Sequence, residues 1–134
     1  MIFDADSVLA GIDDDARTDL IDAVMSLFVA GIWVSVVSTR PRDEVETLVR
    51  HLLGDGLVET IVSVDDLPES EAGLACASEL YRLALWEMGI TSRDALAVTG
   101  VHASAGMPTV TLAAPLSAAS CQQAHRRWWI RQAA

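Results

Sequence analysis

Acidic and hydroxyl-bearing residues stand at the ends of apolar runs in this sequence. Asp4 and Asp6 close the run that begins at Met1, and Ser38 follows the run 32–37. On an extended backbone, side chains two positions apart point to the same side, about 6.6 Å apart along the strand. Two carboxylates in that position repel each other, so one is protonated or a cation holds them charged. The pair suits Mg²⁺, or a nucleophile with a neighbouring acid.

A purely structural explanation of these residues stays open. An isolated Asp-x-Asp pair often serves as a helix cap or a turn former. The strand context, and the Ser-Thr-Arg sequence that ends the second apolar run, favour a site over that explanation. Asp65 and Asp66 follow a third run, where they could add a metal ligand, but the turn before Pro68 explains them more simply.

The spacing of apolar residues predicts the elements that would position this site. Strands are expected at residues 1–5, 32–37, 58–64, 95–99 and 109–113, and helices at 15–30, 42–53, 73–88 and 117–132. Strands that alternate with helices of this length indicate a parallel sheet with both faces covered. We therefore expect a single α/β domain over 1–134. It would be a three-layer α/β/α, Rossmann-like domain with a five-stranded, mostly parallel sheet and a helical tail at 115–134.

Several apolar residues are expected to face the core. In the first helix they are Leu20, Val24, Leu27, Phe28 and Gly31, and in the third Leu74, Ala77, Leu80, Tyr81, Ala84, Leu85 and Met88. Trp33 and Trp86 are expected to be packing residues. Ligands bind beyond the carboxyl ends of the strands in open parallel sheets, which is where Asp4, Asp6 and Ser38 would converge.

Composition narrows the class of protein. The chain has 134 residues, 51% of them hydrophobic, which suits one domain with a real core. Its longest apolar stretch, 27–37, is shorter than the ~20 residues that span a bilayer. No leader-like segment opens the chain, so we expect a cytoplasmic protein without a membrane role. Cys76 and Cys121 lack metal-type spacing and are expected to be buried thiols.

The charge distribution argues against nucleic acid as a partner. The net charge is −10, and the basic residues are all arginines, with no lysine in the chain. The tail is locally basic, with Arg126, Arg127 and Arg131 around the pair Trp128 and Trp129. One indole would pack on the body, and the exposed remainder would make a surface for a protein partner or a homo-oligomer.

Several segments of the chain, which include Asp4, Asp6 and Ser38, resemble motifs of the haloacid dehalogenase (HAD) phosphohydrolase superfamily. Residues 2–9, Ile-Phe-Asp-Ala-Asp-Ser-Val-Leu, resemble its first motif, an apolar strand followed by Asp-x-Asp. Residues 34–40, Val-Ser-Val-Val-Ser-Thr-Arg, resemble its second motif, an apolar strand that ends in Ser or Thr. Segments 79–90, 95–98 and 105–110 resemble later parts of the family, so the resemblance covers about residues 1–114.

The resemblance implies a role for each site residue. Asp4 would be the nucleophile that forms an aspartyl-phosphate, and Asp6 the general acid and base. Ser38 would donate a hydrogen bond to the phosphoryl oxygens, beside Thr39 and Arg40 as substrate-binding residues. Mg²⁺ would be held by Asp4, by the main-chain carbonyl of Asp6 and by an acid after the fourth strand.

The chain departs from the family pattern at two places. Ala75 stands where the family has a lysine, six residues before Tyr81, and an arginine is not a simple substitute. The sequence Thr-Gly-Val-His at 99–102 stands where the family has its fourth-motif acid. His102 is therefore a candidate ligand or acid–base group, whereas His51 is expected at the surface of a helix end. Both departures weaken the electrostatic support for phosphoryl transfer.

Two functions remain open from the sequence. The first is a Mg²⁺-dependent phosphohydrolase that acts through Asp4 and Asp6 on a phosphorylated small molecule or protein. The second is a catalytically silent, HAD-like protein that binds a partner or forms an oligomer. No cap segment separates Asp6 from Ser38, so the site is expected to be open to solvent.

Overall fold

The predicted parallel sheet is present in the computed structural model. The structure describes residues 1–9, 11–67, 77–99, 108–111 and 118–133. One five-stranded sheet has the order β3-β2-β1-β4-β5, and each neighbouring pair is parallel. The strands are β1 (Ile2–Asp4), β2 (Ser35–Val37), β3 (Thr60–Val62), β4 (Ala97–Thr99) and β5 (Thr109–Thr111). The α/β fold class is thus confirmed, with strands shorter than the apolar runs that predicted them.

In the part of the chain that the structure describes, four helices accompany the sheet near the predicted positions. They are α1 (Asp14–Val29), α2 (Arg42–Leu53), α4 (Ala77–Met88) and α5 (Ala118–Ala133). Asp13 caps α1 by accepting a hydrogen bond from the Ala16 amide at 2.8 Å. Gly54 follows α2 with a φ of 71°, a left-handed conformation that glycine adopts without strain. Three short helical turns, η1 (Ala5–Leu9), η2 (Val64–Asp66) and η3 (Ser92–Asp94), were not expected.

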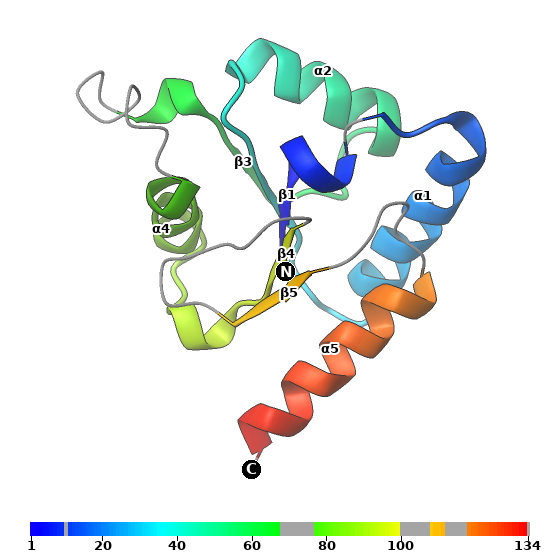
Figure 1. The fold of residues 1–134 in the computed structure, drawn as a ribbon, viewed down its shortest axis with the longest axis vertical. Coiled ribbons are helices and arrows are strands. Elements are labelled where there is room, and N and C mark those ends of the chain that lie inside the picture. The colour runs from blue at the N-terminus through cyan, green and yellow to red at the C-terminus, as the bar shows by residue number, and fades with distance from the viewer. Residues whose placement is uncertain (10, 68–76, 100–107, 112–117, 134) are drawn as a thin grey trace.

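Each face of the sheet has its own hydrophobic core. Because side chains alternate along a strand, Phe3 points to one face and Ile2 to the other. Phe3 belongs to a cluster with buried residues of α1, α2 and α5, and Ile2 to a cluster with α4. Figure 1 shows α1 and α5 on one side of the sheet and α4 on the other. The arrangement is the predicted three-layer domain.

The strand order creates a crevice beside β1. The chain runs from β1 outward through β2 to β3, and then returns to place β4 and β5 on the other side of β1. Connections therefore leave β1 and β4 in opposite directions. In open α/β sheets, ligands bind at such a reversal, outside the carboxyl ends of the strands. Here those ends carry Asp4 and Thr99.

Three apolar side chains expected in the core are exposed instead. Phe28 is 57% exposed, Trp33 56% and Trp86 78%. In α1 the buried stripe is Leu20, Ala23, Val24 and Leu27, and each further residue turns by about 100°, which carries Phe28 off the stripe. Trp86 leaves the buried stripe of α4 in the same way. Trp33 precedes β2, before the chain enters the sheet.

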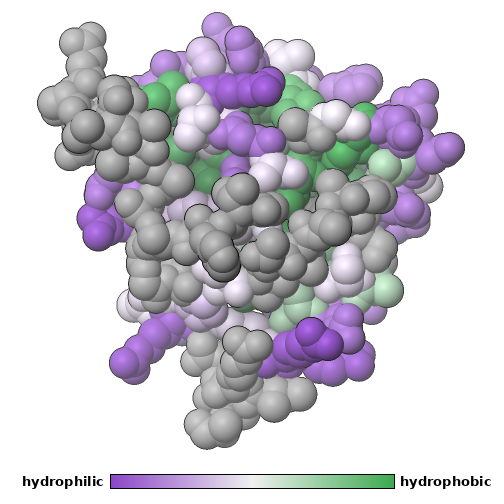
Figure 2. Space-filling model, in the orientation of Figure 1, coloured by the Kyte–Doolittle hydropathy of each residue, from purple (hydrophilic) through white to green (hydrophobic). Residues whose placement is uncertain are grey.

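Several smaller expectations hold. Leu80, Tyr81, Ala84 and Leu85 are buried, and Cys121 is a buried free thiol. Leu74, Cys76 and His102 lie outside the described residues. Within the described ranges, no helix is long and apolar enough to cross a membrane. Hydrophilic residues are spread around the periphery of the face shown in Figure 2 rather than gathered in one place.

Neighbouring residues of α1 provide a matched test of this packing. Leu27 is 1% exposed and Phe28 is 57% exposed. Replacing a buried leucine with alanine leaves a cavity, so Leu27→Ala is expected to lower the free energy of unfolding by about 2–5 kcal/mol. Phe28→Ala is expected to change it by less than about 0.5 kcal/mol. Urea denaturation of both variants checks this, and equal losses would show that α1 is rotated from the orientation described.

Candidate functional site

Asp4 is held at the carboxyl end of β1 by three donors. Its Oδ2 atom accepts hydrogen bonds from the hydroxyls of Ser7 and Thr99, each at 2.8 Å. Its Oδ1 atom accepts one from the backbone amide of Asp6, at 3.1 Å. The two hydroxyl oxygens lie 3.1 Å from each other, so strands β1 and β4 are joined here by a compact polar cluster. The carboxylate is thereby fixed in one orientation.

Asp6 is held by the residues that follow β2. Its Oδ1 accepts from the Ser38 hydroxyl at 2.6 Å, and its Oδ2 accepts from the Thr39 amide and hydroxyl at 2.9 and 2.7 Å. Ser38 is buried and accepts from the Arg40 amide at 3.0 Å. Burial favours the neutral carboxyl, but the bonds from Ser38 and Thr39 and the charge of Arg40 outweigh it. Together they hold the pKa of Asp6 below its usual range.

The predicted geometry of the Asp-x-Asp pair is wrong in one respect. The strand ends at Asp4, and residues Ala5–Leu9 form a π-helical turn rather than continuing the strand. That turn brings the Asp6 amide back onto the Asp4 carboxylate, and it places Ser7 against Oδ2. The two carboxylates are thus separated by their own donors, so a shared cation is not required to hold both charged.

The sequence-predicted residues do converge at one edge of the sheet. Asp4 and Val37 are register partners in β1 and β2, and Ser38 follows Val37 directly. The hydrogen bonds from Ser38 and Thr39 then join this edge to Asp6. In this structure Ser38 donates to Asp6, whereas the family resemblance has it donate to a phosphoryl oxygen.

Asp65 and Asp66 take the structural role. The Asp65 carboxylate accepts from the Arg42 amide at 2.8 Å, at the start of α2. Asp66 forms a capping box with Ser63 and an ion pair with the Arg42 side chain. Arg42 also donates to the Ile61 carbonyl at 2.9 Å and to Glu46 at 3.1 Å. These contacts tie β3 to α2 and do not make Asp65 or Asp66 ligands of the site.

The structure adds Ser7 and Tyr81 to the site and gives Thr99 a contact. Ser7 and Thr99 donate hydrogen bonds to Asp4. Their position, a hydroxyl residue at the end of an apolar segment, is the sequence feature that could have predicted this role. The Tyr81 side chain, from α4, is 1% exposed, and its hydroxyl lies near Thr99 at the end of β4. Burial, together with the charges of Asp4 and Asp6, raises the pKa of Tyr81, and nearby Thr99 opposes the rise in part. The phenol is therefore neutral.

The described residues do not fit the magnesium site that the resemblance implies. Mg²⁺ requires near-octahedral oxygen ligands and gives up water reluctantly. Here Oδ2 of Asp4 already accepts two hydroxyls, and Thr99 occupies the end of β4. In the described part of the chain, no three His, Cys, Asp or Glu side chains gather as they would around a metal ion.

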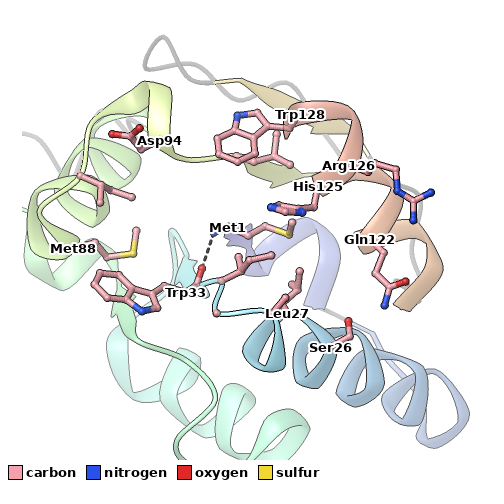
Figure 3. Close-up of a pocket in the computed structure, with 15 residues that line it drawn as sticks. Met1, Ser26, Leu27, Trp33, Met88, Asp94, Gln122, His125, Arg126 and Trp128 are labelled. Carbon is pink, nitrogen blue, oxygen red and sulfur yellow. Dashed lines mark hydrogen bonds between the residues drawn. The ribbon is translucent and has the colours of Figure 1, made fainter. Parts of the chain in front are cut away.

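Among the cavities lined by described residues, the two with the greatest volumes lie at opposite ends of the sheet. One of about 800 Å³ borders Asp6 and Ser38, and extends past Arg40 along α2 to His51, which is exposed as expected. The other, of about 750 Å³, is mainly apolar. It lies near Met1 and α5, away from Asp4 and Asp6. Figure 3 shows Trp33 and Met88 on one side of it and His125 and Trp128 on the other.

The amino group of Met1 is buried in the wall of this second cavity. It donates to the Trp33 carbonyl at 2.7 Å, the dashed line in Figure 3. Burial lowers its pKa to about 6. Trp128 packs against the body, as expected for one indole of the tail, whereas the side chain of Trp129 lies outside the described residues.

Comparison with known proteins finds likeness only among solved structures. No protein-family model and no curated protein sequence matches the chain. The cobalt-bound deoxy-D-mannose-octulosonate 8-phosphate phosphatase (YrbI) of Haemophilus influenzae is 17% identical, with a TM-score of 0.48, over 72% of this chain and 55% of that one. A protein of Legionella pneumophila, described as a HAD superfamily (subfamily III A) hydrolase, gives 17% and 0.46, over 72% and 52%. The chain spans about half the length of each.

The lowered pKa of Asp6 predicts a pH-dependent stability. A carboxyl whose folded pKa lies below its ordinary value of 3.8 stabilises the fold above that value. This contribution is lost as the pH falls through the lower, folded-state pKa. We expect wild type to be more stable than Asp6→Asn at pH 7, and the difference to shrink below about pH 4.

Urea denaturation between pH 7 and pH 3 measures this difference. Asp19→Asn, an exposed change on α1, serves as the matched control and should show little difference at any pH. A gap between wild type and Asp6→Asn that stays constant with pH would mean that the Asp6 carboxylate is not stabilised as its contacts indicate.

Proposed function

We propose that this chain is a HAD-like hydrolase whose Asp4 takes up a phosphoryl group from a phosphate monoester. The observation that carries the proposal is the unequal bonding of the two Asp4 oxygens. Among the described residues, Oδ2 accepts from two hydroxyls, whereas Oδ1 accepts only from the Asp6 amide. Oδ1 therefore keeps a lone pair on a carboxylate that is fixed in orientation, as a nucleophile requires.

The reaction would proceed in two displacements. Asp4 Oδ1 forms a bond to phosphorus while the bond from phosphorus to the leaving-group oxygen breaks, and the leaving group departs with the electron pair. Water then displaces the carboxylate from phosphorus, and the released phosphate carries the oxygen from water. Backbone amides, with the charge of Arg40 beside Asp6, are the available groups to stabilise the developing negative charge. No step is assigned to a metal ion.

The state of Asp6 limits which substrates can react. A general acid must carry a proton, and the contacts from Ser38 and Thr39 keep Asp6 ionised. Asp6 can then accept a proton from water in the second displacement, but it cannot protonate a leaving group in the first. Substrates whose leaving group is a stable anion are therefore favoured, among them aryl and acyl phosphates. The open cavity beside Asp6 leaves room for a phosphorylated small molecule or protein.

Hydrolysis of an aryl phosphate tests the proposal directly. We expect slow turnover of p-nitrophenyl phosphate, and none detectable with an alkyl phosphate such as glycerol phosphate. Asp4→Asn should abolish turnover because no covalent intermediate can form. Asp6→Asn should retain part of it, since acid–base help is worth at most ~10²–10⁴ in rate.

The matched control is Asp19→Asn, which should behave as wild type. Mass spectrometry of the acid-quenched reaction should find phosphate on the peptide that contains Asp4. Turnover that survives Asp4→Asn, or a faster reaction with the alkyl phosphate, would contradict the proposed mechanism.

A second candidate function follows from the same contacts. Asp4 and Asp6 together accept six hydrogen bonds from the protein itself, which is the arrangement of a structural cluster. A folded wild-type protein with no activity towards any phosphate ester would favour a silent, HAD-like binding protein. In that case the exposed Trp33 and Trp86, or the tail around Trp128 and Trp129, would contact a partner or a second copy.

A further inference from the structure

The Oδ2 atom of Asp4 has no vacant lone pair for a cation. A carboxylate oxygen has two lone-pair directions, and Oδ2 uses both, for Ser7 from η1 and for Thr99 from β4. The donors come from two segments 92 residues apart that the sheet holds together. A metal ion at Oδ2 would therefore have to displace at least one of these hydrogen bonds.

Three further carboxylates near this edge of the sheet are bonded to other protein groups. Both oxygens of Asp6 accept from Ser38 and Thr39, and Asp65 and Asp66 contact Arg42. A Mg²⁺ ion held by one carboxylate alone binds weakly, because its hydration shell is costly to remove. Among the described residues, no three His, Cys, Asp or Glu side chains gather to hold such an ion, and the nearby Asp6 carboxylate is already bonded to Ser38 and Thr39.

We propose that the Ser7 and Thr99 hydroxyls replace a divalent cation as the groups that hold and orient the Asp4 carboxylate. The site is then metal-independent, and hydrogen bonds from neutral donors stabilise the charge of Asp4. The inference concerns how Asp4 is held and does not depend on whether the chain turns over a substrate. It departs from the magnesium dependence that the sequence resemblance implies.

The surroundings of the cluster agree with this assignment. Tyr81, buried in the core between α4 and the sheet, keeps its proton because burial and the two carboxylates raise its pKa. A neutral hydroxyl is a hydrogen-bond donor and repels no anion. Hydroxyl and amide donors thus stabilise the charges of Asp4 and Asp6, and the positive charge of Arg40 also acts on Asp6.

Thermal unfolding with and without metal tests the proposal. A ligand that binds only the folded state raises its Tm, so the Tm of wild type in excess Mg²⁺ should equal its Tm in EDTA. Thr99→Asp places a second carboxylate beside Asp4. Its Tm should be lower than that of wild type in EDTA, because like charges repel, and should rise by several degrees in Mg²⁺. Isothermal calorimetry should detect Mg²⁺ binding to this variant and none to wild type.

Thr99→Asn is the matched control, with nearly the same shape and no charge, and its Tm should not respond to Mg²⁺. Should Thr99→Asp fail to fold by circular dichroism, Ser7→Asp places the carboxylate on the same oxygen from η1. A wild-type Tm that rises in Mg²⁺, with the rise lost in Asp4→Asn, would overturn the proposal. A rise that persists in Asp4→Asn locates the metal elsewhere and supports it. A folded Thr99→Asp that ignores Mg²⁺ counts against it.

Discussion

Two carboxylates at the carboxyl edge of a parallel sheet can stay charged only if other groups compensate them, and in this chain hydroxyl and amide donors do so. A half-buried carboxylate loses hydration, and hydrogen bonds to its charged form recover that loss. Ser7 and Thr99 do this for Asp4, as Ser38 and Thr39 do for Asp6. These hydrogen bonds fix the turn after β1 against the ends of β2 and β4.

The same donors connect the topology with the chemistry. Because β4 returns to the opposite side of β1 from β2, each carboxylate is reached from a different strand: Asp4 from β4 and Asp6 from β2. Hydrogen bonds thus link β2, β1 and β4 at the carboxyl edge of the sheet. A ligand that bound Asp4 or Asp6 directly would have to displace some of these donors, so the contacts that stabilise this edge also oppose binding there.

The sequence predicts the layers of this fold better than its details. The alternation of strands and helices along the chain predicted the parallel sheet, and the ends of the apolar runs predicted that Asp4 and Ser38 lie at one edge. Both predictions rest on the periodicity of apolar residues. The turn at Ala5–Leu9 was not predicted, because its five residues show no helical periodicity, and its contacts with Asp4 become visible only in the fold. Trp86 is exposed because of its position around the axis of α4, and Trp33 because it precedes β2. Hydrogen-bond partners such as Thr99 depend on register between strands distant in sequence.

The buried end of the chain has a chemical consequence of its own. The sequence contains no lysine, and the amino group of Met1 lies inside the fold, bonded to the Trp33 carbonyl. Its low pKa leaves it largely unprotonated at neutral pH, yet its burial withholds it from solvent. Reagents that acylate amines, including common dyes and cross-linkers, should react slowly with this amino group in the folded protein and faster as the protein unfolds. Amine acylation would thus report on opening of this wall of the domain.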